Sequence, residues 1–223
     1  MFLIYVYGRK VLFKTPKNFD VKKARLIQKI FSKKVLFKKI DLKKVVYIGG
    51  VDVSYKDSQA TVVAVILNFK TLNVLEVKKL KLKTYFPYIP TLLAFREAPP
   101  IFKVVKTLTI QPDVLMVEGH GIAHPFGCGL ACHVGVVLKM PTIGVAKKLL
   151  FGKMGKYKEN KAPIFWDEKI VGMAIIPKPQ SKPIYVSVGN LITLNQAVKI
   201  VEKCIKKGRM PEPLRLAHLF TKE

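Results

Sequence analysis

The stretch Val45-Val46-Tyr47-Ile48-Gly49-Gly50-Val51-Asp52-Val53-Ser54-Tyr55 decides the fold, because it has the composition of a β-strand and carries a single acid. β-Branched and aromatic residues dominate it, as is typical of strands. The pattern returns at Ala60–Phe69, and Leu80 and Leu82 then alternate with lysines. These patterns predict three successive strands in an antiparallel meander.

Helical and strand patterns alternate after the meander. Thr91–Ala98 has helical composition and is ended by Pro99-Pro100, after which a second helix is expected over Ile101–Leu108. We then expect a buried strand at 113–117, a helix at 130–139, and strands at 142–146, 170–176 and 184–188. A last helix begins at the capping box of Thr193 and Gln196 and is ended by Gly208. This order predicts a single-domain α/β fold in which helices flank a mixed sheet.

The first 44 residues carry less chemical information. Residues 1–19 predict a short strand and a turn, and the segment from Val21 to about Ile40 predicts a basic helix. No repeat or linker separates this part from residues 45–218, so we expect one domain over residues 1–223.

Charge is the unusual property of the whole chain. Lys and Arg total 40 against 14 Asp and Glu, a formal net charge of +26. Such an excess favours a polyanionic partner, above all nucleic acid. A membrane surface is a weaker alternative because the lysines are spread along the chain, and a merely lysine-rich surface is another.

Neither a signal peptide nor an apolar run of about 20 residues is visible, so we expect a cytoplasmic protein with no membrane partner. The three cysteines, Cys128, Cys132 and Cys204, lie among glycines or in apolar helical patterns rather than in a disulfide framework. Reduced thiols are therefore expected.

Three acids are candidates for chemistry. Asp52 lies in an apolar strand, and Glu118 follows the buried run 114–117 directly before Gly119-His120-Gly121. Adjacent parallel strands would bring these two acids together, and Glu97 could face the same point. Clustered carboxylates favour a hard divalent cation, Mg²⁺ or Mn²⁺ rather than zinc, and such ions assist phosphodiester cleavage. The alternative is a solvated Glu97 and a Glu118 that accepts from backbone amides.

The glycine-rich stretch after Glu118 allows two interpretations. His120, His124, Cys128 and Cys132 recur at four-residue intervals, which superficially suggests zinc ligands. The intervening glycines and a proline break any helix that could align them, so a zinc site is disfavoured. The glycine backbone could instead approach a flat base closely.

A stiff turn, Pro87-Tyr88-Ile89-Pro90, precedes Glu97. An aromatic side chain held in this way can act as a wedge that unstacks bases. An ordinary packed tyrosine in a proline turn is the alternative.

Several motifs together resemble the endonuclease V family, in the order in which that family has them. They are Gly50-Val51-Asp52-Val53-Ser54-Tyr55, Pro87-Tyr88-Ile89-Pro90, Phe95-Arg96-Glu97-Ala98-Pro99, Gly119-His120-Gly121-Ile122-Ala123-His124-Pro125, Pro141-Thr142-Ile143-Gly144-Val145-Ala146-Lys147, Tyr185-Val186-Ser187-Val188-Gly189-Asn190 and Pro211-Glu212-Pro213-Leu214-Arg215-Leu216-Ala217-His218. The resemblance covers about Gly50 to His218, and it implies a ribonuclease-H-like fold with residues 45–218 as the catalytic core.

The resemblance also implies a repair nuclease that nicks the second phosphodiester bond 3′ to deoxyinosine in DNA; some members prefer inosine in RNA. It assigns Asp52, Glu97 and Glu118 to a Mg²⁺ site that Mn²⁺ could also fill, and His218 to placing the water or a second ion. Lys147 would meet phosphate charge. It makes Tyr88 the wedge, puts Gly119 and Gly121 at the base pocket, and sets His124 beside the metal. We expect a monomer.

One position departs from the family pattern, because Glu118 stands where the family usually has aspartate. We expect retained activity, since the other acidic, basic and wedge positions are present. Two alternatives stay open: a nuclease that acts mainly on inosine-containing RNA or on branched or mismatched DNA, and a non-catalytic nucleic-acid-binding protein whose site has decayed at Glu118.

Overall fold

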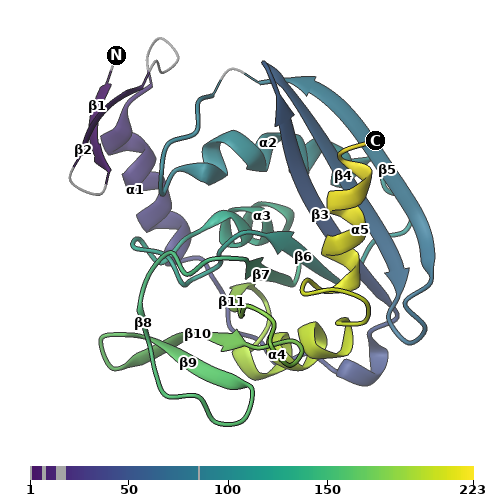
Figure 1. Cartoon of the computed structure of the whole chain (residues 1–223). Coiled ribbons are helices and arrows are strands. Elements are labelled where there is room, and N and C mark those ends of the chain that lie inside the picture. The colour runs from purple at the N-terminus through teal and green to yellow at the C-terminus, as the bar shows by residue number, and fades with distance from the viewer. Residues whose placement is uncertain (1, 7–8, 14–18, 85) are drawn as a thin grey trace.

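The structure is a computed structural model that describes residues 2–6, 9–13, 19–84 and 86–223. In this part of the chain the main feature is a nine-stranded sheet of order β5-β4-β3-β6-β7-β11-β10-β9-β8 (Figure 1). The strands are β3 (Tyr47–Lys56), β4 (Gln59–Asn68), β5 (Val74–Lys83), β6 (Val114–Glu118), β7 (Thr142–Ala146), β8 (Lys153–Met154), β9 (Lys161–Trp166), β10 (Lys169–Ile175) and β11 (Ile184–Asn190).

The sheet is mixed, as the sequence predicts. β3 pairs with β6 and β6 with β7 in parallel, and the other neighbours are antiparallel. The predicted meander is present as β3, β4 and β5 in consecutive antiparallel pairing. The expected α/β fold, ribonuclease-H-like with helices flanking a mixed sheet, is confirmed.

Helices cover both faces of this sheet. Side chains alternate along β4, so that Val62 and Ala64 pack with α2 (Leu93–Lys106) and α3 (Leu130–Leu138), whereas Val63 and Val65 pack with α4 (Leu194–Lys203) and α5 (Glu212–Phe220). Both clusters consist of fully buried aliphatic residues at their centres. Two separate cores therefore hold the central strands β3 and β6 in place.

The N-terminal part forms a hairpin of β1 (Phe2–Val6) and β2 (Arg9–Phe13), followed by α1 (Val21–Ser32). The turn expected within residues 1–19 falls at least partly on residues 7–8 and 14–18, outside the described residues. The helix begins at an Asp20 cap and ends at Ser32, well before the expected Ile40. Beyond it the backbone is held extended, because Leu36 N–H donates to Asn190 and Ile40 N–H donates to the Gln196 side chain.

The expectation that Pro99-Pro100 separates two helices is wrong, since α2 runs through both prolines. A proline at position 100 supplies no N–H to the carbonyl of Arg96, four residues earlier. The Tyr55 hydroxyl donates to that carbonyl at 3.4 Å. Pro100, Ala98 and Ile101 are also buried, so tertiary packing favours the continuous helix.

Several further elements differ from the sequence-based expectation. α4 ends at Lys203 rather than at Gly208, and β8, β9 and α5 are additional. A short 3-10 turn, η1 (Leu42–Lys44), precedes β3. Among the described residues, no helix combines the length and apolar character needed to cross a membrane.

Candidate metal and nucleic-acid site

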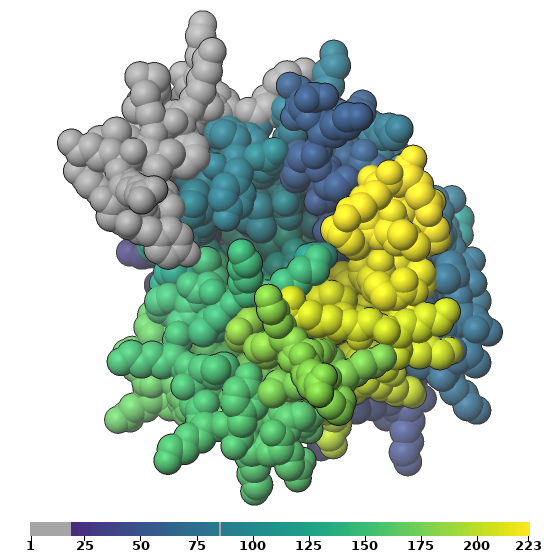
Figure 2. All heavy atoms as spheres, viewed as in Figure 1, coloured from purple at the N-terminus to yellow at the C-terminus, as the bar shows by residue number. Residues whose placement is uncertain are grey.

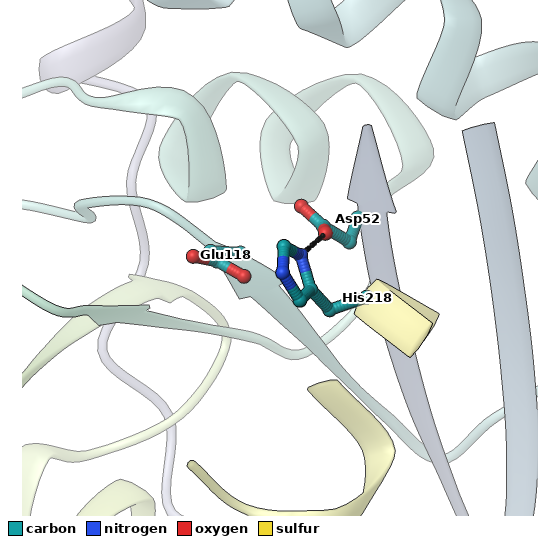
Figure 3. Close-up of side chains that lie close together, drawn as sticks. All are labelled: Asp52, Glu118 and His218. Carbon is teal, nitrogen blue, oxygen red and sulfur yellow. Dashed lines mark hydrogen bonds and ion pairs between the residues drawn. The ribbon is translucent and has the colours of Figure 1, made fainter. Parts of the chain in front are cut away.

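Two acids meet because β3 and β6 are parallel neighbours. Val51 pairs with Val117, which places Asp52, in the middle of β3, beside Glu118, the last residue of β6. The third member is His218 on α5, whose Nδ1 lies 2.7 Å from Asp52 Oδ2 (Figure 3). One ligand atom from each of the three residues lies within 4.8 Å of the others. The predicted adjacency of Asp52 and Glu118 is confirmed.

α5 reaches this point because Gly50 leaves room for it. A Cβ at Gly50 would collide with the backbone of Pro213 in the first turn of α5. At the other end, Ser54 Oγ donates to the carbonyl of Thr221 at 3.1 Å. The helix is thus fixed against β3 at two places, which sets the position of His218.

Glu118 is incompletely paired. Its Oε1 lies 2.6 Å from Lys147 Nζ, while its Oε2 is buried with no hydrogen-bond partner among the described residues. Burial and the charge of Asp52 raise the pKa of the Glu118 carboxyl, and Lys147 opposes this shift. One Glu118 oxygen is thus paired with Lys147, and the other is an unsatisfied buried polar atom.

Glu97 faces the same region from α2 but is not one of the three residues with ligand atoms within 4.8 Å of one another. Burial, and secondly the charge of Asp52, raises the pKa of Glu97 to about 8. The carboxyl group is therefore largely protonated at neutral pH when no cation is bound. A divalent cation nearby would favour its ionised form.

The donor set of the cluster fits a hard divalent cation. The two carboxylates supply oxygen ligands of the kind that Mg²⁺ and Mn²⁺ prefer. The unsatisfied Glu118 Oε2 and the raised pKa values of Glu97 and Glu118 both indicate missing positive charge. The zinc alternative gains no support, because His120, His124, Cys128 and Cys132 form no such group among the described residues.

A cavity of about 790 Å³ opens beside the cluster. Figure 2 shows this face of the molecule hollowed near its centre, with the yellow C-terminal helix at one side. The predicted site residues that line the cavity are Asp52, Tyr88, Glu97, Glu118, Gly119, His124, Lys147 and His218. Its volume is in the range of sites that hold small ligands or single nucleotides.

Tyr88 lies at the cavity and is 54% exposed, whereas the next residue, Ile89, is fully buried. The loop that carries them is held through one carbonyl, that of Thr91. Arg25 Nη1, Gln28 Nε2 and His124 Nε2 lie 3.1, 2.7 and 3.1 Å from this oxygen. Arg25 also stacks on Phe126 at 4.2 Å from the ring centroid. We call these contacts the Thr91 network.

His124 belongs to the Thr91 network rather than to the acid cluster. The Phe126 N–H donates to His124 Nδ1 at 3.2 Å, so Nε2 carries the proton that is directed at Thr91. Burial lowers the pKa of His124 to about 3 and keeps the ring neutral. His124 lines the same cavity as the acid cluster, and its expected place beside the metal stays a prediction.

The two glycines named from the sequence lie in different surroundings. Gly119 lines the cavity and has a φ of 155°, a conformation that favours glycine. Gly121 is buried away from it, where a Cβ would collide with the carbonyl of Val188 on β11, and its N–H donates to Ser187 Oγ. Close packing of the turn against β11 is thus enough to require a glycine at position 121, independently of any nucleotide base in the cavity.

Sequence reasoning does not single out several residues of the cavity wall. Tyr55 and Arg96 form a stacked pair, with the guanidinium carbon 3.8 Å from the ring centroid. Gln28 is fully buried, which is a signal only once the helix is known. The motif that contains Arg96 was the available signal for the first pair.

A model of the endonuclease V family matches residues 29–219. The chain belongs to this family. The endonuclease V of Thermofilum pendens is 44% identical over 206 residues, which cover 92% of this chain and 89% of the relative. The endonuclease V of Dictyoglomus thermophilum is 43% identical, with 88% and 87% covered.

Solved endonuclease V structures have the same fold. The Streptomyces avermitilis protein superposes with a TM-score of 0.85 at 31% identity, covering 93% of this chain and 95% of that one. The Ciona intestinalis protein, in complex with a 24mer DNA that contains an inosine followed by a ribo-adenosine, gives 0.84 at 29% identity, with 91% and 96% covered. This endonuclease V chain is accordingly a nuclease of the DNA-repair class.

Proposed function

We propose that this endonuclease V nicks the second phosphodiester bond 3′ to deoxyinosine in DNA, with Mg²⁺ as the metal and Mn²⁺ as a substitute. The observation that carries the proposal is the convergence of Asp52, Glu118 and His218 beside a cavity of nucleotide size. The Ciona intestinalis relative, crystallised with inosine-containing DNA, supports the substrate class. The net charge of +26 suits the polyanion.

In this proposal Asp52 and Glu118 hold the cation, and Glu97 completes the acidic site once it is ionised. The chemistry that such an ion supplies is Lewis-acid activation of water and stabilisation of the leaving oxygen. Asp52 accepts a hydrogen bond from His218 Nδ1, so it also orients the imidazole. His218 then helps to place the attacking water.

Lys147 and the loop residues act on the substrate. The ammonium group of Lys147 lies against Glu118 and is free to meet phosphate charge when a cation takes over that carboxylate. Tyr88, exposed at the cavity and fixed by the buried Ile89 behind it, serves as the wedge. The backbone at Gly119 approaches the flipped base, and Gly121 supports that turn from behind.

The test is cleavage of end-labelled oligonucleotides under single-turnover conditions. Matched strands carry deoxyinosine, adenine or a mismatch in DNA, or inosine in RNA, and each is incubated with Mg²⁺, Mn²⁺ or EDTA. We expect a nick one nucleotide beyond deoxyinosine that requires the metal. Faster cleavage of inosine RNA than of deoxyinosine DNA would replace the proposed substrate with the RNA alternative.

The control is Asp52→Asn, which keeps the shape of the side chain and removes its charge. Loss of the nick in this variant assigns the activity to the site. Metal-independent binding without cleavage by the wild-type protein would instead support the non-catalytic alternative in which Glu118 marks a decayed site.

A further inference from the structure

Large apolar side chains are exposed along the segment that follows β7. They are Leu150 at 37%, Met154 at 44%, Tyr157 at 38%, Trp166 at 40% and Ile170 at 50%. Single exposed apolar residues are common on proteins, but a group of them next to a binding cavity indicates an interaction surface.

Part of this group shares one face of the sheet. Trp166 lies two residues after the buried Ile164 on β9, and side chains two apart point to the same side of a strand. Met154 on β8 pairs with Ile164, and Lys169 on β10 pairs with Trp166. Paired residues also share a face, so Met154, Trp166 and Lys169 lie together.

This face continues into the catalytic cavity. Ile164 packs in a cluster with Ala123 and Leu149, and Leu149 lines the cavity together with Lys148 and Leu150. The following residue, Phe151, contacts Trp166 edge to face, with ring centroids 5.1 Å apart. In Figure 2 the green surface, which includes this segment, borders the hollow. We name Lys148, Leu150, Phe151, Met154, Trp166 and Lys169 the Trp166 surface.

Its charge favours a nucleic acid as the occupant. The stretch 147–170 contains seven lysines and three acids, namely Glu159, Asp167 and Glu168. Lys148 and Lys169 are exposed, and Lys169 pairs with Trp166 between β10 and β9. Aromatic faces next to cations are the usual means by which proteins hold unpaired nucleotides, through base stacking and phosphate contacts.

We propose that the Trp166 surface is a stacking platform for bases of the nucleic-acid strand where it leaves the catalytic cavity. Lys148 and Lys169 contact the phosphates, while Trp166 and Phe151 contact the bases. The inference goes beyond the cleavage reaction and rests on the proposed function only in that nucleic acid must occupy the cavity.

Trp166 is the chain's one tryptophan, so intrinsic tryptophan emission reports on this surface alone. The wild-type protein is titrated without divalent metal against a labelled single strand with deoxyinosine at its centre and about ten nucleotides on either side. Two shorter strands lack one arm or the other. Anisotropy of the label measures binding independently. We expect the long strand to quench the tryptophan emission. Of the two shorter strands, the one that lacks the arm lying on the Trp166 surface should not quench it and should bind with a roughly ten-fold higher Kd.

Variants separate stacking from packing. Trp166→Ala is expected to raise the Kd of the long strand about ten-fold and to leave unchanged the Kd of the shorter strand whose missing arm removed the quenching, whereas Trp166→Phe retains most of the affinity. Lys169→Ala should weaken binding and its salt dependence, unlike Lys199→Ala on the exposed side of α4. Thermal unfolding checks that each variant is folded.

Two results would overturn the proposal in distinguishable ways. Saturated anisotropy with unchanged tryptophan emission and an unchanged Kd in Trp166→Ala would show that nucleic acid binds elsewhere, and would leave a protein as the partner of this surface. Absence of any binding by anisotropy would refute the proposed function together with the platform.

Discussion

The acid cluster and the Thr91 network line the same cavity but differ in how their polar groups are satisfied. In the network the Thr91 carbonyl faces three donors and Gln28 also accepts from Arg25 at 2.8 Å. In the cluster Glu118 Oε2 has no partner among the described residues and carboxylates lie close to one another. A saturated network positions a loop, whereas an unsaturated cluster awaits a ligand.

The largest effect should come from the cluster. Asp52→Asn is expected to lower the single-turnover cleavage rate on the order of 10³-fold, because one charged ligand of the cation is lost. The same change removes a charge from a group of acids, so the melting temperature without metal should not fall. Rapid-quench cleavage and calorimetry measure the two quantities. A variant with a near wild-type rate would place the chemistry elsewhere.

Breaking the Thr91 network should lower stability and weaken DNA binding, and should leave the rate of cleavage nearly unchanged. Gln28→Leu removes the donor to the Thr91 carbonyl and the acceptor for Arg25 inside the protein, which should cost about 1–3 kcal/mol of unfolding free energy. The Kd for deoxyinosine DNA should rise, while the rate at saturating DNA changes little. Urea denaturation and titration measure this; Lys29→Leu on the exposed side of α1 is the control. A defect confined to the saturated rate would contradict a positioning role.

The pH dependence of stability without metal tests whether Glu97 lacks a neighbouring positive charge. The pKa of Glu97 is raised to about 8 in the folded protein, so the folded state holds a proton that the unfolded chain releases near its ordinary pKa of 4.5. The proton on Glu97 therefore contributes to the free energy of unfolding. This stabilisation is complete below the ordinary pKa and is lost as the pH rises through about 8. The melting temperature without metal should therefore fall over this range in the wild type, and less steeply in Glu97→Gln. Addition of Mg²⁺ should reduce the difference, and parallel curves for both proteins would argue against the shift.

The smallest effect concerns the position at which the family usually has aspartate. Glu118→Asp shortens the side chain that now reaches Lys147 at 2.6 Å, so we expect a less than ten-fold change in cleavage rate. The ratio of rates in Mg²⁺ and Mn²⁺ measures whether the longer carboxylate alters metal preference. An unchanged ratio would show that the extra methylene has no special effect there.

Local sequence patterns were sufficient to predict the strands at the centre of the fold. Apolar runs at β3 and β6, each followed or interrupted by one acid, predicted adjacent strands and the meeting of Asp52 with Glu118, and the structure confirms both. The fold class followed from the alternation of these patterns, and the family from the ordered motifs. The domain boundaries and the roles of single site residues stay predictions.

Features that depend on contacts between residues far apart in the chain could not be predicted from the sequence. The prolines of α2 indicated a break, but the Tyr55 hydroxyl, 41 residues away, reaches the carbonyl of Arg96. The helix that carries His218 was overlooked, although Pro211 and Pro213 suit a first turn. The packing of Gly121 against β11 was not predictable either, because it involves backbone far along the chain. The periodicity of apolar residues is a local pattern and does not report such contacts.

The place of α5 on β3 has a consequence for the order in which activity arises during synthesis. His218 contacts a residue 166 positions earlier, and the chain leaves the ribosome from its N-terminus. β3 and β6 can pair, and the lysines can attract nucleic acid, while α5 is still inside the exit tunnel. The third member of the cluster arrives only after residue 218 has emerged, so a nascent chain can associate with polynucleotides before it is able to cut them.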